Sequence, residues 1–227
     1  MAARRLLLAL TVAALAAQAA SAAEPGWRRA DNERALAIGL TAADAGPGWG
    51  EAGPTRSPYT VDMGSIMASA PGAGCLGQDA PTRAETDLVV SGASMSALAR
   101  PPETLTSFVL VFKTPTLARE QMPAAGTASG LRRCVTGELK TGLGGLLGNG
   151  AVSVAPLGLA TGSPLQASYR IELRLPTGPL YIDLVLQEGG RGIVETLVLS
   201  AAALPPPAGL ERRVTGIAAA RLARYGG

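Results

Sequence analysis

Residues 166–201 decide the fold of this chain, and they read QASYRIELRLPTGPLYIDLVLQEGGRGIVETLVLSA. Apolar and polar residues alternate over 166–175 and again over 180–187, and residues 193–201 form a third β-rich run. The turn sequences PTGP and EGGRG separate the three runs. This pattern predicts an antiparallel meander with one buried face.

Further strands are predicted on the N-terminal side of the meander. Residues 87–98 and 105–112 are β-rich and are separated by a short Pro-containing segment, which predicts a hairpin. Residues 151–157 predict one more short strand. The pair Thr114–Pro115 predicts a helix start, with Thr as N-cap and Pro at the first helical position.

Three other helical segments are expected. Residues 41–44 predict a single capped turn with Thr41 as its N-cap, and residues 127–135 predict a second helical stretch after the Thr114–Pro115 helix. The last segment follows Pro205–Pro207 and should form a helix that packs on the sheet. Its apolar stripe consists of Leu210, Val214, Ile217, Leu222 and Tyr225.

Runs of strands with few helices indicate the α+β class, with an antiparallel sheet packed against helices. We expect one α+β domain over residues 35–227, preceded by a flexible lead-in over 24–34. Residues 51–83 are rich in Pro, Gly and Ser and predict a long N-terminal loop region. The turn at 46–50 presents Trp49, which we expect to be buried and to anchor this region.

The first 23 residues have the three parts of a secretory signal peptide. Arg4 and Arg5 precede the apolar stretch 6–17, and small residues follow at 19–23. The alternative is a retained membrane anchor, but the apolar stretch is shorter than the roughly 20 residues that a span needs. We therefore expect a secreted or cell-envelope protein, located outside the cytoplasm, with no stable membrane span after cleavage.

Composition excludes several classes of chemistry. The chain of 227 residues has no histidine, so serine or cysteine nucleophiles paired with histidine and His-ligated zinc are absent. Removal of residues 1–23 would leave 18 basic and 17 acidic residues, a net charge of 18 − 17 = +1. That balance gives no support for nucleic-acid binding. The pairs Arg132–Arg133 and Arg212–Arg213 are interpreted as solvated helix faces rather than a phosphate site.

The glycine-rich stretch 142–150 is the one segment that suggests nucleotide binding. It lacks the Gly-x-Gly-x-x-Gly spacing and precedes a predicted strand instead of a helix. A mobile loop is the favoured interpretation. No motif in the chain indicates a cofactor or a metal site.

Cys75 and Cys134 are the only cysteines. In an exported chain they are expected to form a disulfide, which would close a loop of about 60 residues and stabilise the fold by roughly 4 kcal/mol. Two separate buried thiols are the alternative.

Three strand carboxylates were considered for catalysis: Glu172, Asp183 and Glu195. The alternation places Glu172 and Asp183 on the polar face beside arginines, where cross-strand ion pairs explain them. Glu195 lies two residues from both Ile193 and Leu197, so its side chain is expected on the same apolar face of the strand. If it is buried and unpaired there, its pKa should be raised. An edge position or an arginine partner is the favoured interpretation, and we predict that none of the three is catalytic.

A series of short features resembles a known family. They are Leu40–Thr41–Ala42–Ala43–Asp44 with Gly48–Trp49, Cys75, the strand end Val111–Phe112, Ala118 and Cys134. Over most of residues 35–226 the chain resembles the extracellular sensor domain of mycobacterial serine/threonine kinases and its free-standing lipoprotein relatives. The resemblance implies a Mog1/PsbP-like α+β sandwich without shared catalytic residues. Those domains commonly carry two disulfides, whereas this chain has cysteines for one.

The function expected from these features is that of an exported, non-catalytic binding or sensor-like domain. Its ligand would be a small molecule, a lipid or a cell-envelope protein, and any signalling would go through a partner. The alternative is a carrier of apolar ligands such as lipids, which requires an internal apolar cavity. A hydrolase that uses carboxylates is the third and least favoured interpretation.

Overall fold

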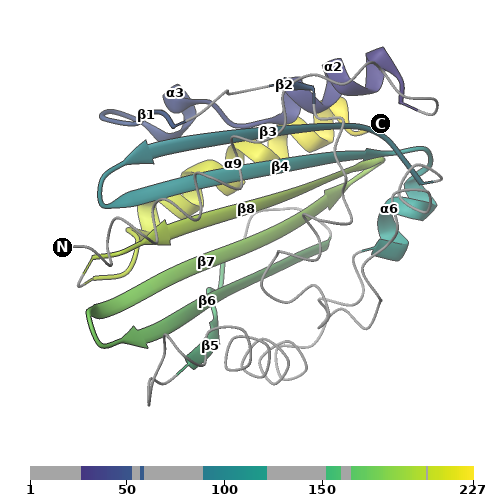
Figure 1. Ribbon diagram of the computed structural model, residues 1–227. Helices are drawn as coiled ribbons and strands as arrows, with labels where there is room; N and C mark the ends of the chain where they lie inside the picture. The colour runs from purple at the N-terminus through teal and green to yellow at the C-terminus, as the bar shows by residue number, and fades with distance from the viewer. Residues whose placement is uncertain (1–26, 53–56, 59–88, 122–151, 160–164, 203) are drawn as a thin grey trace.

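The fold is an antiparallel sheet packed against helices, as a computed structural model of the chain shows (Figure 1). The structure describes residues 27–52, 57–58, 89–121, 152–159, 165–202 and 204–227. Strand order across the sheet is β1-β3-β4-β8-β7-β6-β5, and β2 pairs with β3 beside β1. Every pairing is antiparallel, so the predicted α+β class with an antiparallel sheet packed against helices is confirmed.

The eight strands include all those that the sequence predicted. The hairpin β3–β4 and the meander β6–β7–β8 are confirmed, and β4 joins them by pairing with β8. The strands are β1 (Gly50–Glu51), β2 (Ser57–Pro58), β3 (Val90–Arg100), β4 (Glu103–Phe112), β5 (Val152–Pro156), β6 (Leu165–Leu175), β7 (Gly178–Gly189) and β8 (Gly192–Ser200).

Four helices are described: α2 (Arg29–Ile38), α3 (Ala42–Ala45), α6 (Pro115–Gln121) and α9 (Ala208–Tyr225). Both predicted caps are confirmed. Thr41 and Asp44 form a reciprocal capping box at α3, and the Thr114 hydroxyl accepts the Leu117 N–H at the start of α6. In Figure 1, α9 lies behind the sheet, α2 lies along the β3 side and α6 lies at one end of the strands.

The helix-covered face of the sheet carries two buried clusters. The first joins α3 and α9 to β3, β4 and β8 through residues that include Leu98, Leu105 and Val198. The second joins α2 and α9 to β4 and β8 through Val109 and Val194, among others. Trp49 belongs to the first cluster and is 8% exposed, so its predicted burial is confirmed.

The opposite face also holds buried side chains, which corrects the prediction of a meander with one buried face. Tyr169, Ile171 and Leu173 form a cluster near β5, and Ile193 joins Ala118 of α6 in another. The cause lies in β8, where Val194 and Val198 face the helices while Ile193, Leu197 and Leu199 face the other way, so both faces carry aliphatic side chains. Helix α9 therefore packs on the face that the alternation had assigned as polar.

Close packing of α9 depends on glycine at the β7–β8 turn. A Cβ atom built at Gly192 would lie 2.6 Å from the Leu222 side chain, and one at Gly189 would lie 3.0 Å from Leu222 Cβ. The missing side chains let the C-terminal half of α9 approach the sheet directly.

The lead-in predicted for residues 24–34 is wrong for its second half, because α2 begins at Arg29. Asp31 lies in the first turn of this helix, is buried and is held by two arginines. The polar composition of this segment is therefore that of a helix tied down by ion pairs rather than of an exposed lead-in.

Some predicted features lie outside the described residues. They are the signal peptide 1–23, most of the loop region 51–83, the helical stretch 127–135 with Arg132–Arg133, the glycine-rich stretch 142–150, and both cysteines. These remain predictions. Within the described ranges, no helix combines the length and the apolar composition needed to cross a bilayer.

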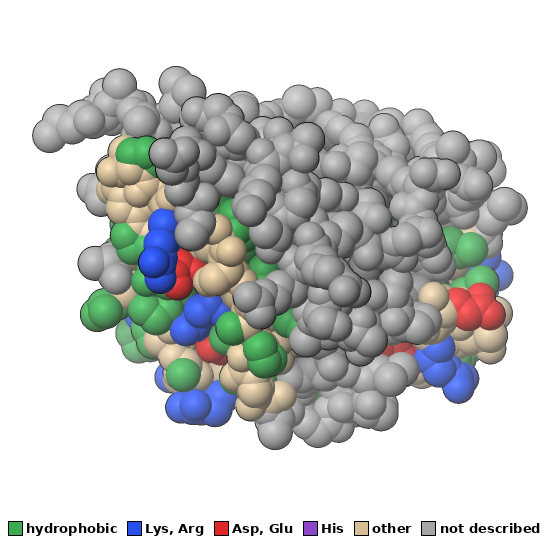
Figure 2. All heavy atoms as spheres, turned by 90° about the horizontal axis from the view of Figure 1, so that it is seen from below, with side chains coloured by type: hydrophobic (Ala, Val, Ile, Leu, Met, Phe, Trp, Pro, Cys, Tyr) green, Lys and Arg blue, Asp and Glu red, His purple; other side chains and the backbone are tan. Residues whose placement is uncertain are grey.

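Viewed from below, the described surface mixes hydrophobic side chains with basic and acidic ones (Figure 2). Neither charge sign dominates the coloured part of this view. This distribution agrees with the nearly balanced charge of the sequence.

Candidate functional site

The three carboxylates that the sequence singled out lie in three different environments. Glu172 is on the helix-covered face of β6, where Arg174 Nε lies 2.9 Å from its Oε1. Its directly opposed neighbour on β7 is Tyr181. The expected cross-strand ion pair is therefore wrong for Glu172, because its arginine comes from the same strand.

Asp183 has the expected cross-strand arginine. It is directly opposite Arg170, whose Nε and Nη2 donate to the two carboxylate oxygens at 2.7 and 2.6 Å. Asp183 is nevertheless 0% exposed, because α9 covers its face of the sheet. The prediction that it points away from the core is wrong.

Glu211 joins this pair from the first turn of α9. Arg170 Nη2 lies 2.8 Å from Glu211 Oε1, and Glu211 is 2% exposed. Burial, followed by a hydrogen bond and the negative charge of Asp183, raises the pKa of Glu211 to about 8, although Arg170 opposes the shift. Two buried carboxyls thus share one guanidinium, and Glu211 keeps its proton at neutral pH.

Glu211 is not among the carboxylates predicted as candidates from the sequence, although a signal for its burial exists. Counting from Glu211 at helical spacing gives Val214, Ala218 and Leu222, all of which are buried. The position therefore belongs to the inner face of α9, and only its charge suggested otherwise.

Glu195 differs from the other two. It lies on β8, a central strand between β4 and β7, so the expected edge position is wrong. Its directly opposed neighbours are Phe108 on β4 and Leu186 on β7. Among the described residues no arginine or lysine forms an ion pair with it, so the expected arginine partner is not found there.

The register defines a patch around Glu195 on the face opposite α9. Two adjacent rows cross β4, β8 and β7, and we call their six residues the Glu195 patch. They are Phe108, Glu195 and Leu186 in one row, and Thr106, Leu197 and Leu184 in the other. All six side chains are partly buried. The patch is thus apolar except for one carboxyl and one hydroxyl.

Two buried clusters border the patch. Beyond Leu186, the residues Ile193 and Leu110 pack against Ala118 and Leu117 of α6. On the β5 side lies the cluster of Tyr169, Ile171 and Leu173. The partly exposed patch therefore lies between two regions that are filled by the protein's own side chains.

The surroundings change the acidity of Glu195. Burial among apolar groups raises its pKa to about 7. Part of the residue's surface is accessible to solvent, while the carboxyl group itself is poorly solvated. A group with such a pKa changes its protonation state near neutral pH, and its carboxylate form lacks the solvation that water would give it.

Catalysis by Glu195 would need a second group. Glu188 lies on the same face, opposite Ile193 and therefore diagonal to Glu195, about 7–8 Å away in an antiparallel pair. Burial raises its pKa, while the charge of Arg119 on α6 acts in the opposite direction. Glu188 is itself buried, at 5% exposure, and it already interacts with Arg119. The second carboxyl is thus engaged within the fold and is a poor partner for chemistry at the patch.

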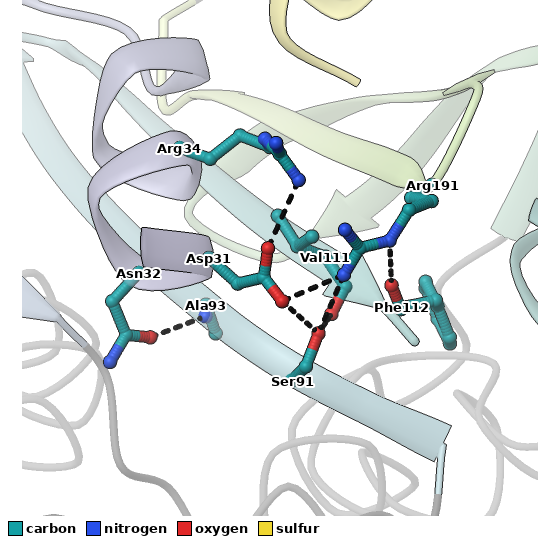
Figure 3. A network of polar contacts seen from close by, with 8 residues as sticks. All are labelled: Asp31, Asn32, Arg34, Ser91, Ala93, Val111, Phe112 and Arg191. Atoms are coloured by element: carbon teal, nitrogen blue, oxygen red, sulfur yellow. Dashed lines mark hydrogen bonds and ion pairs between the residues drawn. The ribbon is translucent and has the colours of Figure 1, made fainter. Parts of the chain in front are cut away.

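A separate polar network ties α2 to the sheet (Figure 3). Asp31 accepts hydrogen bonds from Ser91 at 2.7 Å, from Arg191 at 2.7 Å and from Arg34 at 3.0 Å. Arg191 also donates to the Phe112 carbonyl at 2.7 Å. Burial alone would raise the pKa of Asp31, but the hydrogen bonds from Ser91 and Arg191 and the arginine charges bring it below its usual value.

Each side chain in this network has a partner within it, which marks the network as structural. Residues 90–92 of β3 depart from regular register opposite β4, and this irregularity presents Ser91 to Asp31. A Cβ at Gly92 would lie 2.4 Å from the Asp31 backbone, so glycine permits the close approach of α2. Among the described residues, no group of three or more His, Cys, Asp and Glu could hold a metal ion.

Comparison with known proteins yields a likeness of fold. No protein-family model and no curated protein matches the chain. The extracellular domain of PknH from Mycobacterium tuberculosis is a similar solved structure, with a TM-score of 0.50 and 10% sequence identity. The match covers 85% of this chain and 96% of the PknH domain.

This likeness supports the α+β architecture that the sequence predicted. It also agrees with the predicted resemblance to extracellular domains of mycobacterial kinases, at the level of the fold. The Mog1/PsbP-like assignment was the finer part of that prediction, and it stays a prediction.

Proposed function

We propose that this chain is an exported, non-catalytic binding domain of the sensor-like type, and that the Glu195 patch contacts its ligand. The class of function is supported by the fold shared with the extracellular domain of PknH and by the signal-peptide pattern of residues 1–23. The same two observations support a location outside the cytoplasm, either secreted or in the cell envelope. A Mog1/PsbP-like relationship is part of this proposal.

One observation carries the choice of site: Glu195 is a poorly solvated carboxyl without a cation among the described residues, in a partly exposed apolar patch. Placing an unpaired carboxyl among apolar side chains costs folding free energy. The other strand acids of the meander each interact with an arginine: Glu172 with Arg174, Asp183 with Arg170, and Glu188 with Arg119. A desolvated carboxyl without an arginine partner in the described fold is a candidate for contact with a ligand.

The alternative function, a carrier of apolar ligands such as lipids, is favoured by the composition of the same patch. Three leucines and one phenylalanine surround the carboxyl, so the aliphatic body of a lipid would find matching surface there. A sensor-like domain would bind its ligand reversibly, whereas a carrier would retain it through purification.

Native mass spectrometry of the protein secreted by its own host tests both forms of the proposal. Wild type should carry an added small-molecule mass, or acquire one when incubated with an envelope extract. Glu195→Gln should lose that mass, while Glu172→Gln, at a partly buried carboxyl on the opposite face of the sheet, should keep it.

A retained mass in wild type as purified would favour the carrier. A mass acquired only from the extract would favour the sensor-like domain. Wild type that stays unliganded under both conditions, or Glu195→Gln that binds as wild type does, would contradict the assignment of the site.

A further inference from the structure

We propose that the ligand of the Glu195 patch is an organic cation, an ammonium group on an aliphatic body, and that the Glu195 carboxylate binds the ammonium. This inference rests on the proposed function and specifies the chemical class that the patch would take. Its first support is the unbalanced charge of the patch.

The described part of the fold supplies arginine to its buried acids almost without exception. Asp31 meets Arg34 and Arg191, Glu103 meets Arg100, and one guanidinium serves both Asp183 and Glu211. The partly buried Asp44 meets Arg221. In the described part of the fold, the desolvated carboxyl groups that hold elements together thus each lie beside an arginine. Glu195 has no such cation in the described ranges, and an ammonium ligand would supply one.

Among the described residues of the neighbouring elements, no cation competes for the carboxyl. The β4 residues beside it are Thr106, Phe108 and Leu110, and the facing β7 residues are Leu184 and Leu186. On the same face, Glu188 of β7 lies diagonal to Glu195, and α6, which carries Arg119, packs against β7 and β8. Arg119 is exposed and donates to the Pro115 carbonyl within its own helix, and its charge acts on Glu188. Desolvation without a compensating charge among the described residues thus raises the free energy of the Glu195 carboxylate, which favours a cation there.

The chemistry of the rest of the patch selects an aliphatic ligand body. Three neighbouring strands span about 10 Å at the usual spacing, and leucine occupies three of the six positions. A carboxylate in apolar surroundings attracts an ammonium more strongly than it would in water, because the local dielectric is low. A fatty-acid carboxylate would be repelled, and a neutral alcohol would gain one hydrogen bond without the charge.

The test compares three probes with the same chain length: octylammonium, octanol and octanoate. Each is titrated into the full exported protein by calorimetry at pH 6, 7 and 8. Wild type should bind octylammonium at least tenfold more tightly than octanol at pH 8, and octanoate most weakly. Affinity for octylammonium should rise with pH through the pKa of Glu195, about 7, because the carboxylate forms while the ligand stays charged.

Two variants make the result specific. Glu195→Gln should bring octylammonium and octanol within about twofold of each other and remove the pH dependence. Glu172→Gln should behave as wild type does, and thermal unfolding of both variants checks that they are folded.

Equal binding of octanol and octylammonium by wild type would overturn the cation inference and leave the proposed apolar binding function standing. A preference for octylammonium that survives Glu195→Gln would overturn the role of Glu195. Failure of all three probes to bind wild type would overturn both proposals.

Discussion

Arg191 and Asp31 lie 160 residues apart in the sequence, yet Arg191 Nη2 is 2.7 Å from Asp31 Oδ2. The contact fastens α2 to the turn between β7 and β8, next to the place where α9 ends. Helix α2 begins after Arg28, which supplies no side-chain hydrogen bond to cap it. Its position therefore depends on tertiary contacts, which include this ion pair and the buried hydrogen bond from Ser91 to Asp31.

Replacing Arg191 with Ala should destabilise the protein by about 3 kcal/mol, because it leaves the Asp31 carboxylate buried with one arginine and removes the donor to the Phe112 carbonyl. Urea unfolding at pH 7 measures this loss. Arg29→Ala is the control, since the Arg29–Glu33 pair is exposed and should contribute under about 0.5 kcal/mol. Equal losses in the two variants would refute the assigned role of the buried pair.

Trp49→Ala should cost about 3 kcal/mol or more, because the indole fills part of the cluster between α3, α9 and the sheet. Arg100 also loses its place over the ring, where its guanidinium lies 5.2 Å from the ring centroid. Thermal unfolding is the measurement, and Leu204→Ala, at a residue 75% exposed, is the control. An unchanged melting temperature for Trp49→Ala would mean that the loop 46–50 is held by other contacts.

Stability should fall as pH rises from about 5 to about 8, in part because of Glu211. Its pKa is about 8 in the folded protein and near 4.5 in the unfolded chain, so unfolding releases a proton over this window. The stabilisation is fully present below pH 4.5 and is lost as pH rises through 8. Urea unfolding at unit steps of pH measures the slope.

Glu211→Gln should flatten this pH dependence while retaining stability near pH 8, because the amide can still donate to Asp183. Glu195, with its pKa raised to about 7, contributes a slope of the same sign at lower pH. The double variant with Glu195→Gln should therefore be flatter than either single variant. A slope in Glu211→Gln equal to that of wild type would show that Glu211 does not hold the proton.

Cys75 and Cys134 should be joined in exported protein. Non-reducing peptide mapping should recover one peptide pair that contains both residues, and reduction should lower stability by roughly 4 kcal/mol, as expected for closure of a long loop. Alkylation of both thiols without prior reduction would contradict the pairing.

Local patterns were sufficient to predict most elements of the fold. Alternation over 166–201 predicted the meander, and Thr114–Pro115 predicted the start of α6, because both depend on neighbouring residues. The start of α2 was missed for the opposite reason. Its first turn is polar, and it is ordered by Ser91 and Arg191, which are distant in the sequence.

The same distinction explains the carboxylates. The alternation along β8 correctly predicted that Glu195 lies on the same face as Ile193 and Leu197. Whether β8 is an edge strand depends on the strand order, about which alternation contains no information. The alternation along β6 and β7 likewise predicted that Asp183 shares a face with Arg170. Its burial follows from α9, whose Glu211 completes the cluster from the other side. Side-chain alternation thus gave the face of each residue, while the neighbouring elements determined its solvent exposure.

The most direct test of the central claim, that the Glu195 patch contacts the ligand, is a methyl chemical-shift titration. Leucine and valine methyl groups of the full exported chain are followed by NMR while octylammonium and, separately, octanol are added. Alternating residues of the same strands provide the internal control, because they lie on opposite faces of the sheet.

The account predicts that Leu184, Leu186 and Leu197 shift in a saturable manner, while Val194 and Val198, beneath the helices, stay in place. Shifts confined to the valines, or shifts spread equally over both faces, would contradict it.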